Sequence, residues 1–316
     1  MDFLLYVSDF YIKRNYGMKR NNDVLIKYVS GAAFATLIFL FVILSSVGQT
    51  VLGAFLPKDA VGYIAVAGLL PEIALIITIR LFRKVEHFGL KNVVSEEKPD
   101  PLIILLSVML AGGMMFGLGF INVLIEKLYV YTGLNVNQGF VVGDVFSLVI
   151  YTLVFAVFPS FTEETFFRGL MVKMTDKMKE TPRIIAISLA FALYHCSGVQ
   201  FFYQFIYGLI LGFIAVRGKS TVPCIVAHLV NNAVILLFEF LGIKVDFFAP
   251  LTIAVGITVL TVSIILLQVR FAATEKKRGK DGHVHGKGSE PVSHFYLPFG
   301  IIGMAVCLVL AVLGAI

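Results

Sequence analysis

Long apolar stretches alternate with short polar connections along most of the chain. A helix needs about 20 apolar residues to cross about 30 Å of hydrocarbon, and apolar runs, most of about this length, recur nine times. They lie near residues 30–56, 61–82, 102–125, 141–161, 184–197, 199–216, 222–241, 248–269 and 295–316. Because the fifth and sixth runs are short and close together, we predict an all-α, polytopic bundle of eight or nine transmembrane helices.

The composition agrees with a membrane protein. Hydrophobic residues make up 58% of the 316 residues and charged residues 15%, against about 45–50% and about 25% in soluble proteins. The net charge of +6 does not indicate a nucleic-acid partner, because the basic residues gather in particular loops. We therefore expect the lipid bilayer as a partner and no nucleic acid.

Basic residues mark alternate loops. Clusters of Lys and Arg occupy the N-terminal tail and residues 80–98, 168–183, 217–219 and 270–287, whereas the intervening loops hold single lysines. Since basic loops stay on the cytoplasmic side, the pattern predicts nine helices with a cytoplasmic N-terminus. We expect a multi-pass protein of the cell membrane.

Two adjacent acids stand where the fourth apolar run should still be inside the membrane. Glu163 and Glu164 are followed by Arg168, and an ionisable cluster at such a depth marks a functional site. Residues four apart share a helix face, so Glu164 can pair with Arg168 while Glu163 stays available. Pro159 leaves two alternatives: one continuous helix, or a kink after which the acids open a second helix.

Single histidines follow on later apolar runs. Phe191 lies one turn before His195 as an aromatic wall, and Asn232 lies one turn after His228. A carboxylate, imidazoles and an amide are the groups needed to activate water and to stabilise an oxyanion. The pattern therefore predicts an intramembrane hydrolase.

Metal assistance is an alternative that the residues leave open. Glu163, His195 and His228 could bind a zinc ion with one position left for water. The chain has no HExxH motif, which excludes an ordinary zincin. Cys196, beside His195, is rejected as a nucleophile because buried thiols are usually inert.

The three motifs, taken in order, resemble those of the CPBP family, which comprises CAAX prenyl endopeptidases and bacterial bacteriocin-processing or immunity relatives. The family pattern is EExxxR, then FxxxH, then HxxxN or HxxxD. The matching residues are Glu163, Glu164 and Arg168, then Phe191 and His195, then His228 and Asn232. The resemblance covers roughly residues 150–240.

The resemblance implies a membrane-embedded endopeptidase that acts near the C-terminus of lipidated or membrane-associated polypeptides, through a cavity open to the cytoplasm. It implies that Glu163 with His195 activates water and that His228 with Asn232 forms the oxyanion site. The other charged residues of the EExxxR motif, together with Phe191, would hold the site in shape. Glutamate-activated water is favoured over a metal-bound one.

Other functions remain alternatives. A non-catalytic relative would keep the fold for immunity or for stabilising a partner, and a small ion-coupled transporter would line a pathway with acids. A structural Glu–Arg bridge and packing histidines are the simplest non-catalytic interpretation of the motifs. Glu72, which follows Pro71 in the second apolar run, marks either a kink or a cavity wall.

These predictions divide the chain into four parts. Residues 1–28 form a cytoplasmic segment, either an anchor at the membrane interface or a frayed tail, and residues 29–140 form accessory transmembrane helices. Residues 141–245 form the catalytic transmembrane core. Residues 246–316 form C-terminal transmembrane helices with a mobile cytoplasmic loop at 270–294.

Overall fold

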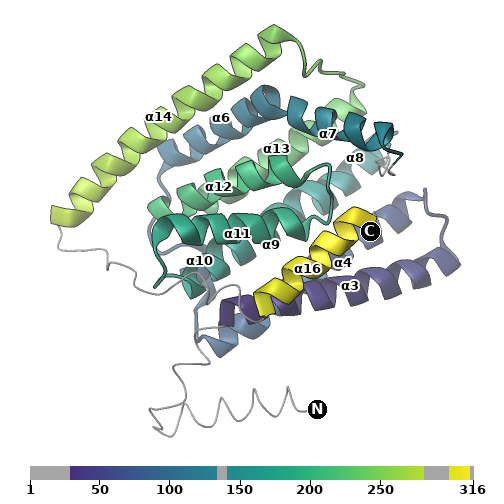
Figure 1. Ribbon diagram of the computed structural model, residues 1–316, viewed down its shortest axis with the longest axis horizontal. Coiled ribbons are helices and arrows are strands. Elements are labelled where there is room, and N and C mark those ends of the chain that lie inside the picture. Colours follow the sequence, from purple (N-terminus) through teal and green to yellow (C-terminus); the bar gives the residue numbers. More distant parts are fainter. Residues whose placement is uncertain (1–28, 134–140, 281–298, 314–316) are drawn as a thin grey trace, which may run out of the picture.

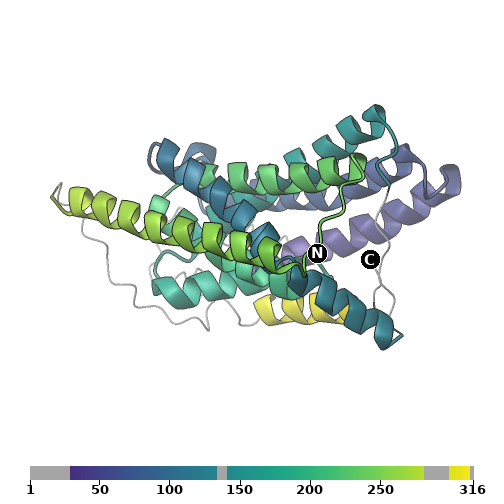
Figure 2. The ribbon, with the colours of Figure 1, turned by 90° about the horizontal axis from the view of Figure 1, so that it is seen from above.

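The computed structural model describes residues 29–133, 141–280 and 299–313, and these residues form helices joined by short turns (Figures 1 and 2). The prediction of an all-α fold is confirmed. The predicted interfacial segment at 1–28 lies outside the described residues. Of the predicted loop at 270–294, the part up to Lys280 continues helix α14, Pro250–Lys280, and the rest lies outside them.

Seven helices in the described part of the chain are long and apolar enough to cross a membrane. They are α3 (Val29–Phe55), α4 (Val61–Val85), α6 with α7 (Pro101–Leu118 and Phe120–Tyr131), the span Val145–Met174, α12 (Phe201–Gly218), α13 (Val222–Phe240) and α14 as far as Lys276. The predicted runs at 184–197 and 295–316 correspond to shorter helices, α11 (Glu180–Tyr194) and α16 (Phe299–Leu313). Because α11 has 15 residues, it is only about 22 Å long.

The span Val145–Met174 is one helix with two distorted stretches. Its parts are α8 (Val145–Tyr151), η1 (Thr152–Val157), α9 (Phe158–Glu164), η2 (Thr165–Met171) and α10 (Val172–Met174), of which η1 and η2 are π-helical. Pro159 lies in the first turn of α9, directly after the π-helical stretch η1, where the backbone hydrogen-bond pattern changes. The structure therefore has the continuous alternative, and the two acids end α9 instead of opening a new helix after a break.

The helices form a middle layer between two outer groups. Figure 1 shows α9–α13 between α6 and α14 on one side and α3, α4 and α16 on the other. One apolar core joins α3, α4 and α16 to η2 and α11, and a second joins α6 and α14 to α12 and α13. The charged motif is therefore enclosed by apolar helices on both sides.

Within the middle layer, α11 and α12 approach closely at two glycines. A Cβ atom added at Gly208 would lie 3.1 Å from the Cβ of Ser188, and one at Gly212 would lie 3.1 Å from Cγ2 of Ile184. Such distances leave little room for a side chain, so small residues allow the two backbones to pack together. The helix that carries His195 is thereby held against α12.

Candidate active site

The three motifs meet in the middle layer from three different segments. Glu163 and Glu164 end α9, Arg168 follows in η2, His195 is the C-terminal cap of α11 and His228 lies in α13. Both acids, the arginine and His228 are buried. Burial among apolar helices removes water from these charges, so each must find a partner within the protein.

Glu164 is the centre of the cluster. Its Oε1 atom accepts a hydrogen bond from Nη1 of Arg168 at 3.0 Å and one from Nδ1 of His228 at 2.9 Å. The predicted pairing of Glu164 with Arg168 is thus confirmed. The bond to His228 was not predicted; it joins residues on α9 and α13 and gives Glu164 a second partner.

The Glu164 bond sets the orientation of the His228 ring. An ionised carboxylate only accepts hydrogen bonds, so Nδ1 of His228 carries the hydrogen and Nε2 faces away. The rings of Tyr207 and Phe191 lie edge-on to the imidazole, with centroids at 6.1 and 6.4 Å. The imidazole is therefore fixed by one carboxylate and two aromatic rings.

Phe191 contacts both the arginine and the histidines. The guanidinium carbon of Arg168 lies 3.9 Å from the centroid of the Phe191 ring, a cation–π contact. The centroid of the His195 ring lies 4.8 Å from the centroid of the Phe191 ring, in an edge-on arrangement. The aromatic wall expected from the FxxxH spacing is present, and it also supports Arg168.

His195 is held by the end of its own helix. Its Nδ1 atom lies 2.8 Å from the carbonyl oxygen of Phe191, one turn earlier. Because a carbonyl accepts, Nδ1 carries the hydrogen and Nε2 keeps its lone pair in the neutral ring. The next residue, Cys196, has a positive φ of 47° and turns the chain away from α11. The His195 side chain is partly exposed.

Glu163 forms no hydrogen bond with the histidines among the described residues and lies near a further acid. Its Oε2 atom is buried without a hydrogen-bond partner among the described residues, and no hydrogen bond or ion pair in that part of the chain joins it to His195 or His228. It is within electrostatic range of Glu72, Glu164 and Arg168. The structure thus brings Glu164, Arg168 and His228 into contact but not Glu163.

Glu72 reaches this region from α4. The Thr162 hydroxyl donates a hydrogen bond to Oε2 of Glu72, and Glu72 is buried. Thr162 immediately precedes Glu163, so Glu72 lies beside the acid pair. The sequence did not decide between a kink and a cavity wall for Glu72, because a bond between residues 90 positions apart leaves no local pattern.

The amide of Asn232 is turned toward the backbone of the distorted span. Its Nδ2 atom donates to the carbonyl oxygen of Phe155 in η1 at 2.9 Å, and its Oδ1 atom accepts from Asn231 at 3.1 Å. A π-helical stretch changes the backbone hydrogen-bond pattern and often occurs at functional sites. The distortion of η1 and the position of Asn232 are therefore linked.

Buried polar atoms without a hydrogen-bond partner collect around this cluster. Within the described residues they include Oε2 of Glu163 and of Glu164, Nε and Nη2 of Arg168, the hydroxyls of Tyr194 and Tyr207, and Oδ1 of Asn231. Native proteins leave few such atoms unpaired. Their concentration indicates a place that receives water or polar groups of a ligand.

The predicted zinc alternative does not fit this arrangement. Among the described residues, no group of three or more His, Cys, Asp or Glu side chains is arranged to hold a metal ion. The bonds from Nδ1 of His228 to Glu164 and from Nδ1 of His195 to a carbonyl leave both Nε2 atoms open, as in a metal-binding histidine, but the described residues do not bring Glu163 to them as a third ligand. We therefore derive no step through a metal.

Comparison with known families identifies the centre of the chain. Residues 145–234 match the family described as type II CAAX prenyl endopeptidase Rce1-like. This part of the chain, which includes all three motifs, is therefore similar to the Rce1-like CAAX endopeptidase domain of the CPBP type. Neither the curated proteins nor the solved structures provide a match.

Proposed function

We propose that this protein is an intramembrane endopeptidase that hydrolyses peptide bonds of membrane-associated or lipidated polypeptides. The observation that carries the proposal is the bond from His228 to the buried Glu164–Arg168 pair, inside a domain that matches Rce1-like CAAX endopeptidases. A buried ion pair that also orients an imidazole is costly to retain for packing alone.

Water activation is assigned to Glu163 and His195. With its Nδ1–H donated to Phe191, His195 presents an unprotonated Nε2 that can take a proton from water. The carboxylate of Glu163 is the second acceptor for that proton. The hydroxide attacks the peptide carbonyl, and the proton passes to the departing amine, so that one water is consumed for each bond broken.

The tetrahedral oxyanion is assigned to His228 and Asn232. Glu164 orients the His228 ring through Nδ1, and the ring can donate from Nε2 to the developing charge when both ring nitrogens carry hydrogen. Asn232 has a second amide hydrogen besides the one given to Phe155. Arg168 limits the cost of the buried Glu164 carboxylate, and Phe191 keeps Arg168 and His195 in place.

The same proposal includes a location and a division of the chain. We place the protein in the cell membrane with a cytoplasmic N-terminus, because basic residues cluster at the Met174–Glu180 turn and at the end of α12. The site would then face the cytoplasm. Residues 141–245 form the catalytic core in this proposal, and 29–140 and 246–316 are accessory to it.

The experiment that tests the proposal compares peptides from cells that carry wild-type protein with those from cells that carry Glu163→Gln or His195→Ala. We expect at least one membrane-associated polypeptide to remain uncleaved in the variants, because losing a general base costs about a hundredfold or more in rate. Glu239→Gln, at an exposed position on α13, is the matched control and should cleave normally.

An unchanged peptide pattern in both variants, with the proteins present at wild-type levels, would reject hydrolysis. That outcome would favour the non-catalytic role in immunity or in stabilising a partner. Metal analysis of the purified wild-type protein is a separate test. Stoichiometric zinc that is lost in His195→Ala would replace the water-activation step given above.

A further inference from the structure

Helix α4 places a buried acid, Glu72, next to the acids of the candidate active site. Glu72 lies near the middle of α4 and is 4% exposed. Its Oε2 atom contacts the hydroxyl of Thr162, the residue before Glu163, and α4 packs against α9 and η2. Glu72 belongs to none of the three motifs, so the proposed function leaves it without a role.

The contact between Glu72 and Thr162 is one hydrogen short when Glu72 is ionised. The Thr162 hydroxyl oxygen lies within hydrogen-bond distance of Oε2 of Glu72 and 2.8 Å from the carbonyl oxygen of Phe158. A hydroxyl has one hydrogen, whereas a carbonyl and an ionised carboxylate only accept. A proton on Oε2 of Glu72 supplies the missing hydrogen, because Glu72 then donates to Thr162 while Thr162 donates to Phe158.

The nearby basic groups are already bound to another carboxylate. Arg168 lies within electrostatic range of Glu163, but its ion pair is with Glu164, and His228 bonds to the same Glu164 carboxylate. Among the described residues, no ion pair joins Glu72 or Glu163 to a lysine, arginine or histidine. Buried carboxylates that lie near one another without a cation do not both ionise. One proton on Glu72 leaves two carboxylates facing Arg168 and His228.

The other elements around Glu72 add no positive charge. Tyr194, on α11, lies within electrostatic range of Glu72 and Glu163, and its buried hydroxyl has no hydrogen-bond partner in the described part of the chain. Helix α8 contributes Tyr151, and α3 and η1, which also pack on α4, contain no titratable side chain. The basic residues of α4 itself begin at Arg80, about 12 Å further along the helix.

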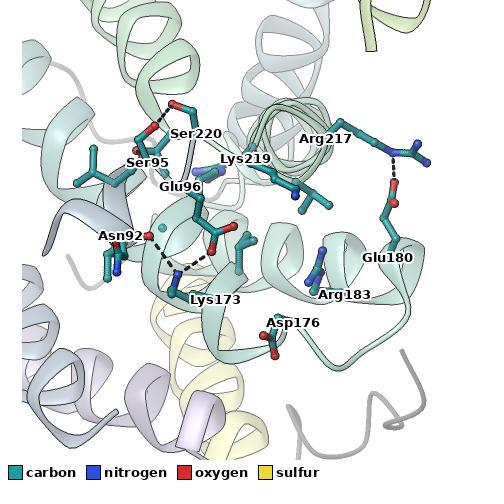
Figure 3. A pocket seen from close by; sticks show the side chains of 18 of the residues that line it. Asn92, Ser95, Glu96, Lys173, Asp176, Glu180, Arg183, Arg217, Lys219 and Ser220 are labelled. Atoms are coloured by element: carbon teal, nitrogen blue, oxygen red, sulfur yellow. Dashed lines mark hydrogen bonds and ion pairs between the residues drawn. The ribbon is translucent and has the colours of Figure 1, made fainter. Parts of the chain in front are cut away.

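Acids at one end of the helices have different surroundings. In a cavity of about 520 Å³, Glu96 pairs with Lys173 and Glu180 pairs with Arg217, both at 2.6 Å (Figure 3). The side chains of these two acids are 51% and 35% exposed. Water and a cation thus stabilise both carboxylates. Glu72 is buried and contacts a hydroxyl in place of a cation, and burial without a cation favours the neutral acid.

We propose that Glu72 is protonated at neutral pH and leaves Glu163 with the single negative charge of these two acids. The inference rests on the proposed function, in which Glu163 accepts a proton from water. Glu72 is then a positioning residue, which acts through Glu163. As a neutral donor it holds α4 to Thr162, and it keeps a second negative charge away from the carboxylate that receives the proton.

The experiment records infrared spectra of the purified full-length protein in detergent at neutral pH, and it needs no substrate. A protonated carboxyl group absorbs through its C=O stretch above the amide I band, where ionised carboxylates do not absorb, and exchange into D₂O lowers the frequency. Wild type is compared with Glu72→Gln, Glu72→Asp and Glu163→Gln. Glu239→Gln, at an exposed position on α13, is the matched control.

We expect the protonated-carboxyl band in wild type, in Glu163→Gln and in Glu239→Gln, and its loss in Glu72→Gln. Glu163→Gln keeps the band because Glu72 is still buried beside Thr162 without a cation. Glu72→Asp retains a carboxyl group on a shorter side chain, so its band should move in frequency; this variant identifies the band if Glu72→Gln fails to fold.

Absence of the band from wild type, its retention in Glu72→Gln, its loss in Glu163→Gln or an unchanged frequency in Glu72→Asp overturns the inference. These outcomes are independent of cleavage. If wild type shows the Glu72 band but the peptide comparison finds no cleaved polypeptide, the proposed function fails and the protonated state of Glu72 stands.

Discussion

Two helix contacts in this protein are built on opposite principles. Helices α6 and α14 meet through glycines: Gly113 faces the backbone of Leu260, and Gly117 faces the backbone of Gly256. Helix α13 instead meets the end of α9 through the buried Glu164, with His228 as its partner. One contact uses close apolar packing, and the other uses charge.

The comparison indicates that only the apolar contact is explained by helix association alone. Helices in hydrocarbon can associate through small residues that let backbones approach, with no buried charge. A buried ion pair gains little over apolar residues of similar volume, because desolvation offsets the attraction. The polar contact is therefore the less economical way to join two helices, which fits a site kept for chemistry.

The largest expected loss of stability comes from removing Arg168, the cation of the polar contact. Arg168→Met should lower the free energy of unfolding by about 3–5 kcal/mol, because Glu164 is left as a buried charge without its ion-pair partner. Denaturant titration in detergent micelles measures the change. Arg270→Met, which breaks an ion pair whose arginine is 44% exposed, should cost less than about 1 kcal/mol.

A double variant sharpens this prediction. Glu164→Gln combined with Arg168→Met removes both charges, so more than half of the lost stability should return. If the double variant is as unstable as Arg168→Met alone, desolvated charge is not the cause. The contrast between the two contacts would then have a different explanation.

The apolar contact should respond to a single methyl group. A Cβ atom at Gly256 would overlap the backbone of Gly117, so Gly256→Ala should cost about 3 kcal/mol, the upper part of the range for overpacking. In Gly112→Ala, on α6, the added Cβ atom meets no atom within 4 Å, and the change should be neutral or stabilising by up to about 1 kcal/mol. Equal effects of the two substitutions would contradict close backbone packing.

A smaller effect is expected where α4 meets α9. Thr162→Val removes the hydroxyl that donates to Glu72 and should cost about 1–2 kcal/mol, because a buried acceptor loses its partner. Thr258→Val removes only an exposed bond within α14 and should change stability by about 0.5 kcal/mol or less. The melting temperatures of the two variants in micelles measure the difference. Similar losses would mean that the Glu72 bond has no special weight.

The sequence predicted features that depend on neighbouring residues. Apolar run lengths placed the helices, and the four-residue spacing placed Arg168 on Glu164. It could not predict the His228–Glu164 bond, which joins residues 64 positions apart, or the π-helical stretches on either side of α9.

The smallest effect is expected at the exposed end of the helix that carries the acid pair. Asp144 caps α8: its carboxylate accepts the backbone N–H of Ser147 at 2.6 Å, and the Ser147 hydroxyl accepts from the Asp144 backbone at 3.1 Å. The Ser147 bonds lower the pKa of Asp144 below its usual value. A lowered pKa means that the cap stabilises the fold above the unfolded-state pKa, about 3.9, and that this contribution disappears as pH falls through the folded-state value.

Asp144→Ala should therefore lower the melting temperature slightly at neutral pH, and the difference from wild type should shrink on acidification. Asp144→Asn keeps a capping oxygen without a titrating charge, so its melting temperature should stay close to wild type at neutral pH. A deficit of Asp144→Ala that persists unchanged at low pH would show that the carboxylate charge does not contribute. Water screens the charge of Asp144 at this end of the helix, whereas Glu164, in the same helix, depends on Arg168 and His228; the two acids should thus differ most where solvent access differs most.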